Sequence, residues 1–130
     1  ANNGKSHQTI LVAEDEEINF LYIEMIFKKE MEGNFKLIHA KNGKEAVDIC
    51  LHDPNIELVL MDIKMPIMNG HEATHLIKTN YPKLPVFALT AYSTESDKEY
   101  ALSHQFDEFI AKPIDKFLFK ALIQKHLNIQ

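Results

Sequence analysis

The chain has 130 residues, and its 14 Lys and Arg residues against 19 Asp and Glu residues give a formal net charge of −5 at pH 7. Hydrophobic residues make up 45% of the chain, which is enough to form the core of one domain without a disulfide or a structural metal. The mild acidity and the absence of a Lys/Arg block exclude the basic surface of a nucleic-acid or anionic-membrane binder.

The longest apolar runs, 58–61 and 86–89, are far shorter than the roughly 18 residues that cross a bilayer, so we expect no membrane span. The one cysteine, Cys50, lies in an apolar periodic stretch and is expected to be a small buried hydrophobe. A reducing, cytoplasmic location fits these features best.

Short apolar runs alternate with longer amphipathic stretches along the chain, which is typical of an α/β fold. The predicted strands cover 9–13, 35–39, 57–61, 86–89 and 108–111. The predicted helices cover 17–31, a segment from 43 to a stop at 53–55, 70–79, 95–103 and 115–126. Helix-forming crossovers between successive strands indicate a parallel, doubly wound sheet with right-handed connections.

Periodicity also predicts which side chains are buried. The core face of the first helix is marked by Phe20, Ile23, Ile26 and Phe27. The core face of the second helix is marked by Ala46, Val47, Cys50 and Leu51. The third and fourth strands are apolar throughout, as expected of strands that helices cover on both faces.

Polar side chains follow the predicted strands at their carboxyl ends, where ligands of such sheets bind. These residues are Glu14 and Asp15, Asp62, Thr90 and Lys112. At about 5 Å and an effective dielectric constant near 20, two carboxylates repel by roughly 3 kcal/mol, so a trio of them indicates a cation site or raised pKa values. An all-oxygen cluster favours Mg²⁺, Mn²⁺ or Ca²⁺ over zinc.

The segments LVAEDEEIN, LVLMDIKMPIMNG, ALTAYS and FIAKPID, in this order and spacing, resemble the receiver domain of two-component response regulators. The resemblance covers about residues 9–128 and leaves 1–8 as a polar linker or cloning remnant and 129–130 as a tail. It implies a single-domain, flavodoxin-like (βα)5 sandwich whose five-stranded parallel sheet has the order 2-1-3-4-5.

The resemblance further implies that Asp62 accepts a phosphoryl group from a phosphohistidine of a histidine kinase or histidine phosphotransfer protein. In that family Mg²⁺ assists the transfer, and Mn²⁺ can replace it. The ion would be bound directly by Asp15 and Asp62, through water by Glu14, and by the main-chain carbonyl of Lys64. The isolated domain would catalyse its own phosphorylation and dephosphorylation.

By the same resemblance, Thr90 and Lys112 contact the phosphoryl oxygens. Thr90 and Phe109 would form a switch in which the aromatic ring turns inward when the hydroxyl moves, although an ordinary half-buried core Phe is the alternative interpretation. Lys64 and Tyr92 occupy the positions that tune the lifetime of the phosphorylated state.

Backbone geometry can be anticipated at a few positions. The Lys112-Pro113 step matches one whose peptide bond is commonly cis in the family, and Pro66 and Gly70 are expected to shape the loop after Asp62. Gln105 stands where relatives usually have glycine, so we expect an irregular, left-handed turn there.

Two sequence patterns bear on other functions. His71-Glu72-Ala73-Thr74-His75 matches the HExxH pattern of zinc metallopeptidases, with Glu95 as a third ligand, and His71 and His75 alone can bind divalent metal adventitiously. A peptidase would leave the carboxylate, Thr and Lys residues at the strand ends unexplained. A flavin or nucleotide module is disfavoured because acidic residues, and no glycine-rich turn, follow the first strand.

The segment EDEEIN, with Asn19 four residues after Asp15, resembles the corresponding segment in receivers of hybrid histidine kinases more than that in receivers fused to DNA-binding domains. A receiver excised from a hybrid sensor kinase, whose parent can be membrane-anchored, is therefore the first hypothesis. A stand-alone single-domain regulator is the alternative. Neither predicts contact of this domain with nucleic acid or membrane.

Overall fold

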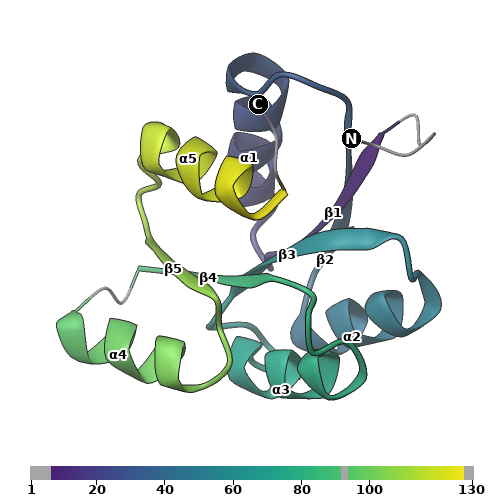
Figure 1. The fold of residues 1–130 in the computed structure, drawn as a ribbon. Helices are drawn as coiled ribbons and strands as arrows, with labels where there is room; N and C mark the ends of the chain where they lie inside the picture. The colour runs from purple at the N-terminus through teal and green to yellow at the C-terminus, as the bar shows by residue number, and fades with distance from the viewer. Residues whose placement is uncertain (1–6, 92–93, 128–130) are drawn as a thin grey trace.

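A computed structural model describes residues 7–91 and 94–127 of the chain, in which strands and helices alternate throughout (Figure 1). The strands are β1 (Gln8–Ala13), β2 (Phe35–Ala40), β3 (Ile56–Asp62), β4 (Val86–Thr90) and β5 (Glu108–Ala111). The helices are α1 (Glu17–Glu30), α2 (Gly43–His52), α3 (Gly70–Asn80), α4 (Glu95–Ser103) and α5 (Lys116–Leu127). Every predicted element is present, and each bound either matches the prediction or differs from it by one residue.

The strands form one parallel sheet in the order β2-β1-β3-β4-β5, which confirms the predicted doubly wound topology. The strand order reverses at β1, because β2 is added on one side of β1 and β3, β4 and β5 are added on the other side. All five strands remain parallel. In folds of this kind ligands bind beyond the carboxyl ends of the strands at such a reversal.

Helices cover both faces of the sheet, with α1 and α5 on one side and α2, α3 and α4 on the other (Figure 1). Alternate side chains of each strand point to opposite faces. The core beneath α1 and α5 includes Ile10, Val12, Leu58, Leu60, Phe87 and Leu89. The core beneath the other three helices includes Leu11, Ala13, Val59, Met61, Val86 and Ala88. Two-sided burial explains why β3 and β4 are apolar throughout.

The predicted core faces of the helices are largely correct. Ile23, Ile26 and Phe27 of α1 are buried, and Phe20 is half-buried. Cys50 of α2 is buried as expected, but the prediction for Leu51 is wrong, because this side chain is 43% exposed. An α-helix turns about 100° per residue, which takes Leu51 away from the face that Cys50 buries.

Side-chain caps mark where α2, α3 and α5 begin, and Thr94 caps α4 in the same way. The Asn42 side chain accepts a hydrogen bond from the Glu45 amide at α2 (2.8 Å), and Asn69 accepts one from the Glu72 amide at α3 (3.0 Å). Asp115 accepts hydrogen bonds from the amides of the second and third residues of α5, so this helix starts at Lys116 and not at 115. Such caps satisfy amides that have no partner within the helix.

The anticipated backbone irregularities are present. Gln105 has φ of 80°, in the left-handed region, and the Lys112-Pro113 peptide bond is cis. Within the described ranges, no helix combines the length and the apolar character needed to cross a membrane.

Candidate functional site

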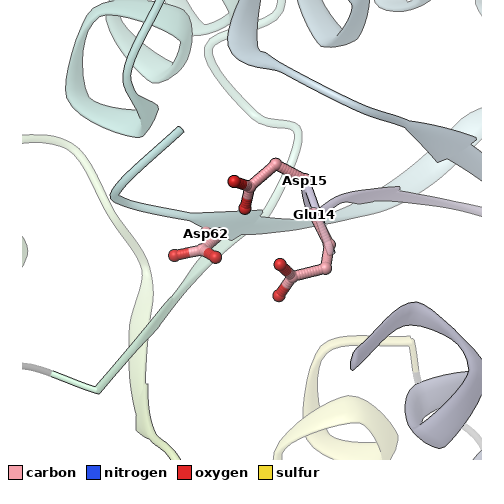
Figure 2. Close-up of side chains that lie close together, drawn as sticks. All are labelled: Glu14, Asp15 and Asp62. Atoms are coloured by element: carbon pink, nitrogen blue, oxygen red, sulfur yellow. The ribbon is translucent and has the colours of Figure 1, made fainter. Parts of the chain in front are cut away.

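Three carboxylates meet at the carboxyl ends of β1 and β3. Glu14 and Asp15 directly follow β1, and Asp62 is the last residue of β3. Strand register brings Ala13 opposite Met61, so the residues that follow lie side by side. One oxygen from each of the three carboxylates lies within 4.8 Å of the others (Figure 2). Among residues 7–91 and 94–127, this is the one group of three or more side chains close enough to share a metal ion.

The three carboxylates differ in their exposure to solvent. Glu14 is fully buried and Asp62 is 7% exposed, whereas Asp15 lies at the surface. The cluster is therefore open on the Asp15 side and closed on the Glu14 side. Crowded carboxylates with one open side make a site that a hydrated divalent cation can enter.

Lys112, the residue after β5, extends its ammonium group into this cluster. Its Nζ atom lies 2.7 Å from Glu14 Oε1 and 3.1 Å from Asp62 Oδ2. Its main-chain N–H donates to the Thr90 carbonyl at 2.8 Å, which fixes the start of the side chain at the edge of β4. Strands β3 and β4 separate β5 from β1 in the sheet, so only a long side chain can reach Glu14 from this position.

The lysine stabilises the charged form of Glu14. Burial by itself raises the pKa of this carboxyl, but the hydrogen bond and charge of Lys112 and the hydrogen bond from the Glu16 amide outweigh burial and lower the pKa below its usual value. The Lys112 ammonium shows the converse effect, because its bonds to Glu14 and Asp62 outweigh burial and raise its pKa. Both groups are therefore ionised at neutral pH.

Asp62 is in a different electrostatic state. Burial and the neighbouring negative charge of Glu14 raise the pKa of Asp62 to about 6, and the attraction of Lys112 offsets only part of this. One ammonium group thus pairs with two carboxylates, and its contact with Glu14 is the shorter one. Asp62 has a raised pKa and lies where the strand order of the sheet reverses. A carboxylate with these two properties is a candidate for catalysis or for cation binding.

The loop after Asp62, residues 63–69, is held close to this carboxylate. The Lys64 amide faces Asp62 Oδ1 at 3.3 Å, and the Gly70 amide donates to the Ile63 carbonyl at 2.8 Å. A Cβ atom on Gly70 would overlap the main-chain carbonyl of Asp62, so only glycine fits there. Gly70 therefore shapes the loop as predicted.

The far side of the same loop rests on the start of α2, which the sequence did not indicate. The Gly43 amide donates to the Met68 carbonyl at 3.0 Å, and a Cβ atom on Gly43 would overlap that oxygen. Within this loop, Ile67 has φ of 71°. It lies in a tight turn that is closed by a hydrogen bond of 2.7 Å from the Met68 amide to the Pro66 carbonyl. A β-branched residue avoids positive φ, so no local propensity predicts this turn.

Thr90 and Phe109 lie on the adjacent strands β4 and β5, and β4 is the neighbour of the strand that ends in Asp62. Thr90 ends β4 and is buried, and Phe109 pairs with Ala88 across the β4–β5 ladder. The Phe109 side chain is half-buried against the core beneath α2, α3 and α4. Lys64 lies in the loop after Asp62, whereas Tyr92 lies outside the described residues.

The HExxH pattern does not form a metal site in the described part of the chain. His71 is half-buried on α3, with its ring 4.8 Å from that of Tyr100 between centroids. His75 Nδ1 lies 3.2 Å from Gln105 Oε1, and Glu95 opens the next helix, α4. These side chains are not gathered into a group of metal ligands. The metallopeptidase alternative therefore has no structural support.

Comparison with known proteins assigns the family. The family model described as the response regulator receiver domain matches residues 10–124. The chain belongs to the response regulator receiver domain family. It is thus a receiver domain of phosphorelay signal transduction, as its motifs indicated.

This receiver domain is 35% identical over 124 residues to hybrid signal transduction histidine kinase I of Dictyostelium discoideum. The match covers 88% of this chain but only 7% of the kinase, so the chain spans a small part of that relative.

Two solved structures have the same fold at 26% sequence identity. The receiver domain of sensor histidine kinase PA1611 from Pseudomonas aeruginosa PAO1, with a magnesium ion coordinated in its active-site cleft, has a TM-score of 0.83 and covers 95% of this chain and 99% of that chain. The co-crystal structure of the Saccharomyces cerevisiae phosphotransfer protein Ypd1 with the receiver domain of Ssk1 gives a TM-score of 0.79 and covers 93% and 89%.

Proposed function

We propose that this receiver domain accepts a phosphoryl group onto Asp62 from a phosphohistidine of a partner protein, in a reaction that depends on Mg²⁺. The observation that carries the proposal is the meeting of Asp62 with Glu14 and Lys112 at the switch point of the sheet. An Asp62 oxygen would form a bond to phosphorus while the phosphorus–nitrogen bond breaks, and the imidazole of the partner would keep that electron pair.

The residues of the cluster fit a divalent cation. All three acidic side chains offer hard oxygen ligands, and their oxygens lie within 4.8 Å of one another. We assign direct contacts to Asp15 and Asp62, a water-mediated contact to Glu14 and a main-chain contact to the Lys64 carbonyl. When bound, Mg²⁺ would neutralise charge on the transferring phosphoryl oxygens, and Mn²⁺ would serve the same purpose.

Charge explains why further donors are needed. Three carboxylates balance a divalent cation and the Lys112 ammonium, but an acyl phosphate on Asp62 carries about −2 and leaves the site one charge more negative. The Thr90 hydroxyl can donate a hydrogen bond to the added oxygens, and Lys112 can pair with them. Movement of Thr90 toward the phosphate would leave room for Phe109 to turn inward. Lys64 and Tyr92 would tune hydrolysis.

An exposed apolar surface on α1 adjoins the site. Four apolar side chains on α1 are well exposed, among them Ile18 at 71%; they are Ile18, Leu21, Tyr22 and Met25. A groove of about 450 Å³ runs from Ile18 and Tyr22 to Lys112 and Pro113. We assign this face to the phosphohistidine-bearing partner, and the similarity to the receiver crystallised with the histidine phosphotransfer protein Ypd1 supports the assignment.

The similarity to a hybrid histidine kinase supports a parent protein in which this domain is the receiver of such a kinase. The buried, unpaired thiol of Cys50 suits a reducing compartment, so we place the domain in the cytoplasm.

The test is phosphorylation by acetyl phosphate with Mg²⁺, followed by intact-mass measurement. The wild type should gain the mass of one phosphoryl group, and removal of Mg²⁺ with EDTA should prevent the gain. Asp62→Asn should show no gain, whereas Asp48→Asn, at an exposed position on α2, should label like the wild type. Equal labelling of Asp62→Asn would overturn the assignment of the acceptor.

A further inference from the structure

Strand β2 holds the main chain of Glu14 on both sides of its Cα atom. The Glu14 amide donates to the Ala40 carbonyl at 2.9 Å, and the Glu14 carbonyl lies 2.7 Å from Nε2 of the His39 ring. The first contact continues the β1–β2 ladder, in which Ala13 pairs with Ala40. The second is a side-chain contact that begins where β1 has ended.

The chemistry of this contact sets the state of the ring. A carbonyl oxygen only accepts hydrogen bonds, so His39 Nε2 must carry a hydrogen and donate it. The ring also lies flat against Phe20 of α1, with centroids 4.0 Å apart and an interplanar angle of 3°. Stacking on one face and a hydrogen bond at the edge together hold the ring in one orientation.

The Glu14 carbonyl belongs to the peptide plane that joins Glu14 to Asp15. Because a peptide is planar, a donor that holds its oxygen also fixes the direction in which the Asp15 backbone leaves. Asp15 depends on this direction, since its exposed side chain makes no hydrogen bond or ion pair of its own within the described part of the chain. Glu14, by contrast, is also held through its carboxylate by Lys112 and the Glu16 amide.

We infer that His39 is a positioning residue for the acidic cluster: its Nε2–H group orients the Glu14–Asp15 peptide so that the Asp15 carboxylate faces Asp62. The inference rests on the proposed function, in which Asp15 and Asp62 bind Mg²⁺ directly. Groups that orient metal ligands from outside typically change metal affinity by about ten-fold or more when they are removed.

Two substitutions separate the hydrogen bond from the packing. His39→Phe keeps a flat ring for Phe20 and removes the donor, whereas His39→Gln removes the ring and keeps an N–H donor. The dissociation constant for Mg²⁺ is measured by calorimetry without a phosphodonor, and the thermal midpoint is measured in EDTA. His39→Phe should weaken Mg²⁺ binding about ten-fold, and His39→Gln should bind within about three-fold of the wild type.

A role in packing alone would lower the thermal midpoint of His39→Gln and leave Mg²⁺ affinity equal in both variants, and that result would overturn the inference. If His39→Phe does not fold, His39→Val, which also lacks a donor and suits a strand, answers the same question. Wild-type protein that binds no Mg²⁺ would overturn the proposed metal site and this inference together. Normal binding by the wild type and unchanged binding by the donor-free variants would overturn the inference alone.

Discussion

Lys112 Nζ lies 2.7 Å from Glu14 Oε1, although 98 positions separate the two residues in the chain. The same nitrogen lies 3.1 Å from Asp62 Oδ2. The shorter contact goes to the more deeply buried carboxylate, so Glu14 stays ionised while the pKa of Asp62 rises to about 6. Of the two carboxylates that Lys112 contacts, the proposed acceptor Asp62 is thus the one that the ammonium neutralises less.

Removal of the Lys112 charge should raise the pKa of Asp62 further. Burial and the charge of Glu14 both raise the pKa of Asp62, and Lys112→Met removes the ammonium that lowers it. The carboxyl of Asp62 should therefore titrate above about 6 in metal-free buffer. The measurement is a ¹³C NMR titration of the Asp62 carboxyl carbon. Lys44→Met, which removes an exposed ammonium on α2, is the matched control and should leave the titration unchanged. A wild-type titration curve in Lys112→Met would contradict the role given to the lysine.

In the metal-free protein, the contribution of Asp62 to stability should fall as the pH rises from about 4 to about 6. The pKa of Asp62 is 3.8 in its ordinary state and about 6 in the folded protein, so the folded state holds this proton more tightly than the unfolded state does. Folding is therefore favoured below the lower value and penalised above the higher one, by up to about 3 kcal/mol.

Asp62→Asn removes this titration. In EDTA the variant should be more stable than the wild type at neutral pH, and the difference should shrink toward pH 4, as measured by urea unfolding across this range. Asp48→Asn serves as the control for loss of an exposed carboxylate. Parallel stability curves for the wild type and Asp62→Asn would show that Asp62 titrates normally.

Asp15→Ala should weaken Mg²⁺ binding without harming the fold. The substitution removes one exposed carboxylate from a crowded trio and no buried contact, so stability in EDTA should be unchanged or slightly higher. Mg²⁺ should raise the thermal midpoint of the wild type, because a ligand that binds only the folded state stabilises it. That increase should be largely lost in Asp15→Ala. A lower midpoint for the variant in EDTA would contradict the prediction.

Gly43→Ala should disturb the loop that follows the acceptor. Alanine normally favours a helix over glycine by about 1 kcal/mol, but here its Cβ atom would overlap the Met68 carbonyl and push on residues 63–69. We expect a net destabilisation of about 1–3 kcal/mol, typical of an overpacked site, and slower labelling by acetyl phosphate. Lys44→Ala, at the next and exposed position, should do neither. A stabilised Gly43→Ala that labels normally would show that the loop tolerates the shift.

Much of the fold could be predicted because it depends on local patterns. The apolar runs of β3 and β4 required helices on both faces, and a parallel sheet places all carboxyl ends at one edge. That rule alone brought Glu14, Asp62 and Lys112 to the same place. The prediction that Leu51 is buried is wrong, because the apolar character of a residue does not reveal which side of its helix meets the sheet.

The backbone conformation of Ile67 and the environment of the HExxH histidines could not be predicted from local sequence patterns. Ile67 adopts a positive φ against its own preference because Gly43 and Gly70 hold the loop from two sides. The HExxH histidines match a metal-site pattern, yet His71 packs against Tyr100 of the next helix. In each case a contact between distant segments overrides the preference of the local sequence.

The sequence by itself determined the order of strands and helices, the residues that follow each strand, and the family to which they point. Only the tertiary structure decided how charge is divided among those residues, and which main-chain atoms hold them. Lys112 favours Glu14 over Asp62, and His39 meets the Glu14 carbonyl, because strand order, register and side-chain reach set these distances. Electrostatic and hydrogen-bond energies depend on distances of a few ångströms between residues far apart in the chain.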